Sequence, residues 1–164
     1  MKKIILIIVT VLLPFFGVGQ IKSASLQASG LTCSMCSNSI YKSLKTISFI
    51  ENIESDVETS TFNIVFKNNE NVDLDALQEA VAKAGFSVAN LRFVINVDNL
   101  KIKNEEKYDI GGKSFYFINV KDKVLNGDVE FRIVDKDFVL PKEYKKLKNK
   151  LEPSGAQRIY NVTI

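Results

Sequence analysis

Two cysteines lie three positions apart in the segment SGLTCSMCSNSI, which covers residues 29–40 of the 164-residue chain. Cys33 and Cys36 are the chain's two cysteines. Their C-x-x-C spacing suits a disulfide, a redox centre, part of a zinc site or a complete site for a softer metal ion. The chain contains no histidine. This excludes histidine general bases, the Ser-His-Asp and Cys-His arrangements and histidine metal sites, so any metal chemistry must use sulfur or carboxylate.

The ligand count separates the candidate metals. Two thiolates on one loop suit a cation that prefers two soft ligands, and Cu(I) is the commonest such ion, with Hg(II) another. Zn(II) prefers four ligands, so a zinc site would need carboxylates or a second chain in addition to Cys33 and Cys36. A structural disulfide and a redox pair stay open as alternatives. Against a thioredoxin-like redox pair, Ser34-Met35 stands where Gly-Pro is usual and the chain has no tryptophan.

The segments that must position this pair alternate between strand and helix patterns. Cys33 falls in a loop after a strand, and Cys36 falls in the first turn of a helix, where unpaired N–H groups and the helix dipole favour a thiolate. Asp73 is a suitable N-cap for a second helix, and Gly85 suits its end. The expected strands are 23–31, 50–57, 61–66 and 86–97, and the apolar helix stripes are Ile40, Leu44 and Ile47, then Leu74, Leu77, Val81 and Ala84.

This order of strand, helix, strand, strand, helix, strand is the ferredoxin-like βαββαβ plan. The remainder of the chain is β-rich, with expected strands at 114–120, 129–134 and 158–164, and Asn126-Gly127 is a strong turn signal. Pro141 can open a short helix carrying Tyr144, Leu147 and Leu151. The predicted fold class is therefore α+β, a ferredoxin-like domain followed by a small β-rich, barrel-like domain. The predicted segments are 1–19 signal peptide, 20–97 first domain and 98–164 second domain of unknown role.

The first twenty residues have the pattern of an export signal. Lys2 and Lys3 precede an apolar run, and Gly17 and Gly19 provide small residues before a cut at Gln20. The apolar run is shorter than the roughly 20 residues of a membrane span, so we expect no stable membrane insertion after cleavage. We expect an exported, periplasmic protein.

Charge argues against a nucleic-acid partner. Lys2 and Lys3 supply two of the three net positive charges, so the exported chain is nearly neutral. The charge is uneven, with −3 over residues 21–100 and +4 over 101–164, which hints at two units. Five lysines between 142 and 150 surround the helix that Pro141 opens. Because that helix already has an apolar stripe, we interpret the lysines as its solvent-exposed face.

The segment Gly30-Leu31-Thr32-Cys33-Ser34-Met35-Cys36 and the later Lys83-Ala84-Gly85-Phe86 resemble the heavy-metal-associated domain family over residues 23–95. That family includes copper chaperones, domains of copper-transporting ATPases and a periplasmic mercury-binding protein. The resemblance implies that Cys33 and Cys36 are metal ligands, that Thr32 flanks the first ligand and that Phe86 shields the site. Leu31 stands where the family usually has methionine, a mild change because the two side chains have similar volume.

The resemblance implies an exported protein that binds Cu(I) and transfers it by ligand exchange to another metal-binding or metal-transporting protein. Hg(II) capture at the same site is the nearest alternative, and Zn(II) remains possible. A redox or structural C-x-x-C in a module that binds partners through residues 98–164 is the alternative of a different class. The chain carries no recognisable catalytic motif, so we expect no enzyme activity.

The leader pattern generates a first prediction. Exported protein should begin at Gln20 or a neighbouring residue, because Gly17 and Gly19 satisfy the requirement for small residues before the cut. Mass spectrometry of the intact exported protein measures its N-terminus directly. Recovery of the Met1 terminus in the membrane fraction would show that the leader is a retained anchor.

Overall fold

The computed structural model describes residues 19–31 and 34–164. The predicted signal peptide, apart from Gly19, lies outside the described residues, as do Thr32 and Cys33. Gly19, the last residue of the predicted signal peptide, is hydrogen-bonded to the fold: its N–H donates to the Asn96 carbonyl at 2.7 Å, and the Asn96 N–H donates to the Gln20 carbonyl at 3.2 Å.

Eight strands and three α-helices occur within the described residues. The strands are β1 (Ile21–Ser29), β2 (Ile50–Asp56), β3 (Thr61–Phe66), β4 (Ser87–Ile102), β5 (Glu106–Ile110), β6 (Lys113–Phe117), β7 (Lys123–Ile133) and β8 (Ile159–Thr163). The helices are α1 (Ser34–Leu44), α2 (Leu74–Lys83) and α3 (Pro141–Leu147), with a 3-10 turn, η1 (Lys148–Lys150), after α3.

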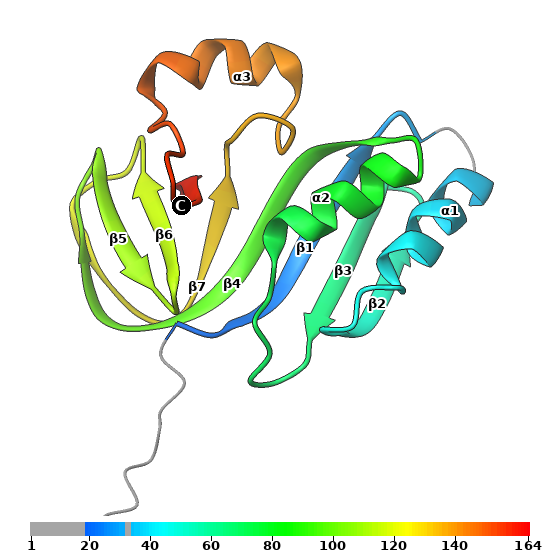
Figure 1. Ribbon diagram of the computed structural model, residues 1–164, viewed down its shortest axis with the longest axis horizontal. Coiled ribbons are helices and arrows are strands. Elements are labelled where there is room, and N and C mark those ends of the chain that lie inside the picture. Colours follow the sequence, from blue (N-terminus) through cyan, green and yellow to red (C-terminus); the bar gives the residue numbers. More distant parts are fainter. Residues whose placement is uncertain (1–18, 32–33) are drawn as a thin grey trace, which may run out of the picture.

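The first half has the predicted ferredoxin-like arrangement. Its strands lie in the order β2-β3-β1-β4 and pair antiparallel, and α1 and α2 pack together on one face of this part of the sheet (Figure 1). The alternation along β1 places Ala24, Leu26 and Ala28 in the core, as the sequence pattern predicts. The secondary-structure order up to β4 is therefore the one expected.

Local sequence signals explain where α2 begins and ends. The Asp73 carboxylate accepts hydrogen bonds from the N–H groups of Asp75 and Ala76, which makes Asp73 the N-cap as predicted. Leu74, Leu77 and Val81 are fully buried on the sheet. Gly85 follows the helix with a φ of +88°, a conformation that costs glycine little because it lacks a Cβ atom.

The second half joins the first half through one long strand. β4 is 16 residues long, and residues 87–95 pair with β1 while residues 91–102 pair with β7 on its other edge. The described strands form a single sheet in the order β2-β3-β1-β4-β7-β8-β6-β5. The two halves therefore share one backbone hydrogen-bond network.

The predicted domain boundary between residues 97 and 98 falls inside β4. At that point the register with β7 shifts between Val97 and Leu100, so β4 carries one extra residue. Asn99 has a φ of +46°, and its N–H donates to the Asn126 side-chain carbonyl at 2.5 Å. The change in sequence pattern at this position coincides with a β-bulge in a continuous strand. The division of the chain into a first domain at 20–97 and a second at 98–164 stays a prediction.

The expected turn at Asn126-Gly127 is wrong. Both residues lie within β7, where Gly127 has a φ of +74° and stands opposite Val97 at the bulge. Asparagine and glycine both tolerate a left-handed backbone conformation. In β7 this conformation bends the strand, whereas in a turn it would reverse the direction of the chain. β6 consequently pairs with β5 and, in parallel, with β8, rather than with β7.

The sheet of the second half also differs from the expected barrel. β5 pairs with β6 and was absent from the predicted elements, because its sequence, EKYDI, has a weak apolar pattern. Within the described residues the sheet has two open edges, at β2 and β5. None of the helices that the structure describes is long and apolar enough to cross a membrane.

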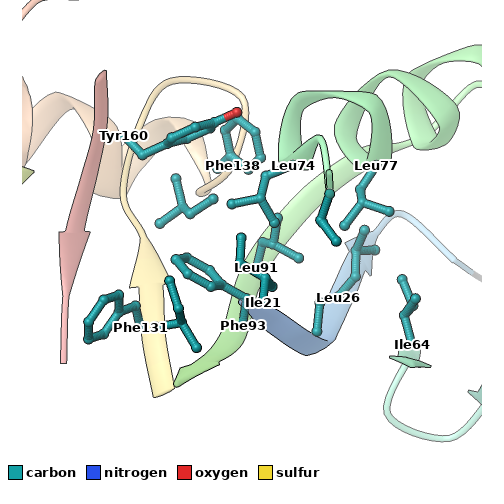
Figure 2. Packing of buried hydrophobic residues seen from close by; sticks show 14 of the residues in the cluster. Ile21, Leu26, Ile64, Leu74, Leu77, Leu91, Phe93, Phe131, Phe138 and Tyr160 are labelled. Carbon is teal, nitrogen blue, oxygen red and sulfur yellow. The ribbon is translucent and has the colours of Figure 1, made fainter. Parts of the chain in front are cut away.

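An aromatic cluster forms the core of the second half and reaches into the first. Phe93 of β4 packs against Phe115 and Phe131, with ring centroids 5.6 Å and 5.7 Å apart, and Phe117 meets Phe131 edge to face at 5.1 Å. The same buried cluster continues to Leu26 of β1 and to the two leucines of α2 (Figure 2). One hydrophobic core therefore serves both halves.

A polar network supplies a second connection between the halves. The Arg158 guanidinium forms two hydrogen bonds with the Asp75 carboxylate of α2, each 2.9 Å long, and donates to Asp135 at 3.0 Å. Asp135 also accepts from the Asn161 side chain at 2.7 Å, and the Tyr160 hydroxyl donates to Asp75 at 3.1 Å. These bonds hold the first turn of α2 against the segment that leads into β8.

Burial changes the titration of two groups in this network. Burial raises the pKa of Asp135 above its ordinary value, although Arg158 and Asn161 act in the opposite direction. Burial and the neighbouring Asp75 carboxylate raise the pKa of Tyr160. The tyrosine hydroxyl therefore stays protonated and donates a hydrogen bond to Asp75 over the physiological range.

The shared core generates a prediction for stability. Phe131→Ala should lower the free energy of unfolding by about 3–5 kcal/mol, because it removes a fully buried ring that contacts aromatic residues from both halves. Val124→Ala is the matched control, since Val124 lies on the same strand and is half exposed, and it should change stability by less than about 0.5 kcal/mol.

Urea unfolding followed by circular dichroism measures both variants. Because one core joins the halves, we expect one transition for the whole chain. Two separate transitions in the Phe131→Ala variant, with the first half keeping its native stability, would contradict the shared core.

Candidate metal centre

The C-x-x-C segment connects β1 to α1 at one end of the sheet. β1 ends at Ser29, and Gly30 takes a φ of +81°, which turns the chain out of the strand. α1 begins at Ser34, directly after the predicted ligand Cys33. This is the expected strand-to-helix loop.

Cys36 lies in the first turn of α1, as the sequence predicts. It is the third residue of the helix and is half-buried. The first turn of a helix has N–H groups without intrahelical partners, and the helix dipole makes this end electropositive. A metal complex with two thiolates is anionic when the metal is Cu(I), so this end of α1 would stabilise such a complex if one formed there.

The structure places one of the two predicted ligands. Cys33 lies outside the described residues, and its position relative to Cys36 stays a prediction. Among the described residues, no group of three or more cysteine, aspartate and glutamate side chains could hold a metal ion. The C-x-x-C pair stays the predicted ligand set, and the structure describes Cys36 of that pair.

Leu31 and Phe86, to which the family resemblance gives roles at the site, both pack against the main core, and shielding of the site by Phe86 stays a prediction. Leu31 is partly buried and packs against the main core, so leucine supports the loop where methionine is usual in the family. Phe86 is also partly buried against the core, and it follows the left-handed Gly85 at the end of α2. The Phe86 N–H donates to the Val81 carbonyl at 3.1 Å, which fixes the backbone of this residue.

A hydrogen bond between the two helices positions α1, and the sequence pattern did not reveal it. The Ser43 hydroxyl donates to the Ala80 carbonyl of α2 at 2.7 Å. Ile40 and Leu44 on the same helix are fully buried. Serine in the middle of an amphipathic helix is an ambiguous signal, because its hydroxyl usually bonds within its own helix or faces water.

Met35 lies between the two cysteines and faces solvent. Its side chain is 79% exposed, the largest exposure among the bulky apolar residues that the structure describes. The Met35 side chain therefore lies at the protein surface, at the start of α1, and does not pack against the apolar core.

The comparisons with known proteins agree with this arrangement. The family model described as the heavy-metal-associated domain matches residues 25–87. The match includes β1 from Ser25 onward, the C-x-x-C loop, α1, β2, β3, α2 and the first residue of β4. It covers less than half of the chain, so it describes this segment and not residues 98–164. No curated protein sequence matches the chain.

Solved structures align with about the same part of the chain. The yeast copper transporter domain CCC2A is 24% identical, covers 41% of this chain and 90% of its own, and gives a TM-score of 0.36. Oxidized MerP from Ralstonia metallidurans is 24% identical over 42% of this chain and 97% of its own, with a TM-score of 0.38. The N-terminal domain of a potential copper-translocating P-type ATPase from Bacillus subtilis is 28% identical over 42% and 85%, also with a TM-score of 0.38.

The family recognition made from Gly30-Leu31-Thr32-Cys33-Ser34-Met35-Cys36 and Lys83-Ala84-Gly85-Phe86 is therefore confirmed: residues 25–87 match the heavy-metal-associated domain.

Proposed function

We propose that this chain binds Cu(I) through Cys33 and Cys36 and passes the ion to a thiolate-bearing partner protein. The observation that carries the proposal is the match of residues 25–87 to the heavy-metal-associated domain, with both cysteines inside the matched segment. The position of Cys36 at the electropositive end of α1 supports it. The absence of histidine limits the soft donors of the exported chain to these two thiols and the Met35 thioether.

Transfer follows from the low coordination number of the bound ion. Two thiolates leave Cu(I) open to attack by a third thiolate from a partner. The partner's Cu–S bond forms before one of the original Cu–S bonds breaks, so the ion is never free in solution. The copper stays Cu(I) throughout, and no bond of an organic molecule is broken. The chain therefore acts as a carrier and not as an enzyme.

Hg(II) is the second candidate cargo, because it also accepts two thiolates. Zn(II) is the weakest candidate, since it would need two further ligands from a partner or a second chain. We propose an exported, periplasmic location on the strength of the leader pattern in residues 1–19. In an oxidising compartment the two cysteines could also form a disulfide, which is the redox or structural alternative.

Metal titration tests the proposal. Reduced protein should bind one Cu(I) per chain, and Cys33→Ser or Cys36→Ser should each remove most of the affinity, because a two-coordinate ion has no spare ligand here. Competition with chelators of known affinity measures Cu(I), Hg(II) and Zn(II) binding. Ser39→Ala is the matched control, since Ser39 is exposed on the same helix and bonds only to the Met35 carbonyl within α1.

Two outcomes would contradict the copper assignment. Unchanged Cu(I) affinity in the Cys33→Ser, Cys36→Ser double variant would move the site elsewhere in the chain. Zn(II) bound as tightly as Cu(I) would show that the site gains ligands beyond the two thiols.

Oxidation separates the metal site from a structural disulfide. A Cys33–Cys36 disulfide must block Cu(I), because the metal needs deprotonated, unpaired sulfur. The loop that such a bridge would close is short, so it should stabilise the fold little, and reduction should change the melting temperature only slightly. Cu(I) should then raise the melting temperature of the reduced protein by mass action. Calorimetry of the oxidised, reduced and Cu(I)-loaded forms measures these effects, and a large loss on reduction without a copper response would favour the structural alternative.

A further inference from the structure

A cleft of about 590 Å³ lies between the two halves. One wall comes from α2, and the opposite wall comes from α3 and the residues after it (Figure 1). The loop at 135–138 and the segment 151–154 complete it. Its volume is in the range of ligand-binding sites. The cleft exists only because the second half packs beside α2, so the heavy-metal-associated segment alone would lack it.

The floor of the cleft is the network centred on Arg158. Two carboxylates, those of Asp75 and Asp135, share this one guanidinium, so the floor carries a net negative charge. The Asp75 side chain is about one-third exposed. The Nε and Nη1 groups of Arg158 are committed to Asp75, Asp135 and the Ile159 carbonyl. This commitment leaves Arg158 poorly able to bind an anion.

Carboxylates also outnumber basic groups around the whole cleft. Glu79, Asp137 and Glu152 join the two floor carboxylates, against Lys136 and Lys148 besides Arg158. The surrounding half of the chain has the opposite sign, since residues 101–164 carry a net charge of +4. A local negative excess in a basic region selects for a cationic ligand.

Two polar side chains in the walls are available to a ligand. Within the described part of the chain, neither the Gln78 amide nor the Tyr144 hydroxyl forms a hydrogen bond with another residue, although both line the cleft. An amide can both donate to and accept from a peptide backbone. The Tyr144 ring adds an aromatic face, which attracts cations.

The α3 wall is held loosely enough to adapt to a ligand. None of the residues of α3 is fully buried. The helix is attached by Tyr144 and Leu147, which pack on a small satellite core, and by two hydrogen bonds between Glu143 and Arg132, 2.7 Å and 2.9 Å long. The hydrogen bonds from Arg132 hold the pKa of Glu143 below its ordinary value, so this attachment persists at neutral pH.

We propose that this cleft binds a lysine or arginine side chain of a partner polypeptide, with the cationic group directed at Asp75 and the adjoining peptide backbone bonded by Gln78 and Tyr144. This function is separate from metal binding. Residues 98–164 would then recognise a partner polypeptide, because they form the binding cleft together with α2.

Titration of the full, metal-free chain with short peptides tests the proposal by NMR. The probes are acetylated and amidated Ala-Lys-Ala and Ala-Arg-Ala, and the matched probes are Ala-Gln-Ala and Ala-Glu-Ala. We expect saturable amide shifts at α2, at 135–138 and at 144–154 for the cationic peptides, with dissociation constants on the order of 1 mM. Absence of saturation with the cationic peptides, or equal binding of Ala-Gln-Ala, would overturn the proposal.

Variants on the cleft rim separate recognition from folding. Gln78→Ala and Tyr144→Phe should each weaken peptide binding about two- to tenfold, because each removes one hydrogen bond. The Asp137→Asn, Glu152→Gln double variant should weaken binding up to about fivefold, and asparagine tolerates the φ of +69° at position 137.

The matched control is Asp98→Asn with Glu70→Gln, two exposed carboxylates outside the cleft, and it should bind peptide as the parent does. Unchanged binding in the Gln78 and Tyr144 variants would place the peptide elsewhere and overturn the proposal. Cleft shifts that appear on raising protein concentration without peptide would show that a second copy fills the cleft, which would also overturn it. Cu(I) binding, measured in parallel, should be the same in all these variants, so failure of the cleft leaves the metal site unaffected.

Discussion

The pairing of β4 on both of its edges is the constraint on which the rest of this structure depends. Residues 91–95 exchange backbone hydrogen bonds with β1 on one side and β7 on the other, so the last strand of the ferredoxin-like half lies inside the sheet. Buried backbone groups need partners, and β7 supplies them between residues 91 and 102 of β4, apart from the bulge after Val97. The bulge at Asn99 then bends the shared strands and lets Phe93 pack with Phe115 and Phe131.

The pairing of β4 with both halves also determines what supports the C-x-x-C loop. α1 and α2 pack on a sheet whose core extends into residues 98–164, and Arg158 fixes the first turn of α2 by its two hydrogen bonds to Asp75. The hydrogen bond from the Ser43 hydroxyl to the Ala80 carbonyl then joins α2 to α1, the helix that contains Cys36. The segment with the candidate metal site therefore takes part of its stability from the second half, and residues 98–164 support that segment as well as forming one wall of the cleft.

The sequence predicted the elements that have local signals and missed those that depend on distant partners. Asp73, the apolar stripe of α2 and Gly85 define a helix by themselves, and the C-x-x-C spacing with the Gly85-Phe86 motif located the candidate site. Asn126-Gly127 was misread because the same backbone conformation serves a turn and a bulge, and only the pairing strand distinguishes them. The ion pair between Arg158 and Asp75 joins residues 83 positions apart in the chain. No periodic sequence pattern indicates such a contact, so it was not predicted.

The direction of β1 fixes how the candidate metal site is presented. The strand starts next to the predicted leader, at Ile21, and ends at Ser29, immediately before the cysteine loop. Nine extended residues separate these points by roughly 30 Å. Cys36 therefore lies at the end of the sheet opposite the start of β1. A partner can therefore reach the N-terminal end of α1, where Cys36 lies, without approaching the start of β1. The C-terminal end of β7 and the start of α3 lie at the same end of the sheet (Figure 1). The proposed metal transfer and the proposed recognition through the cleft would then both take place at this end of the molecule.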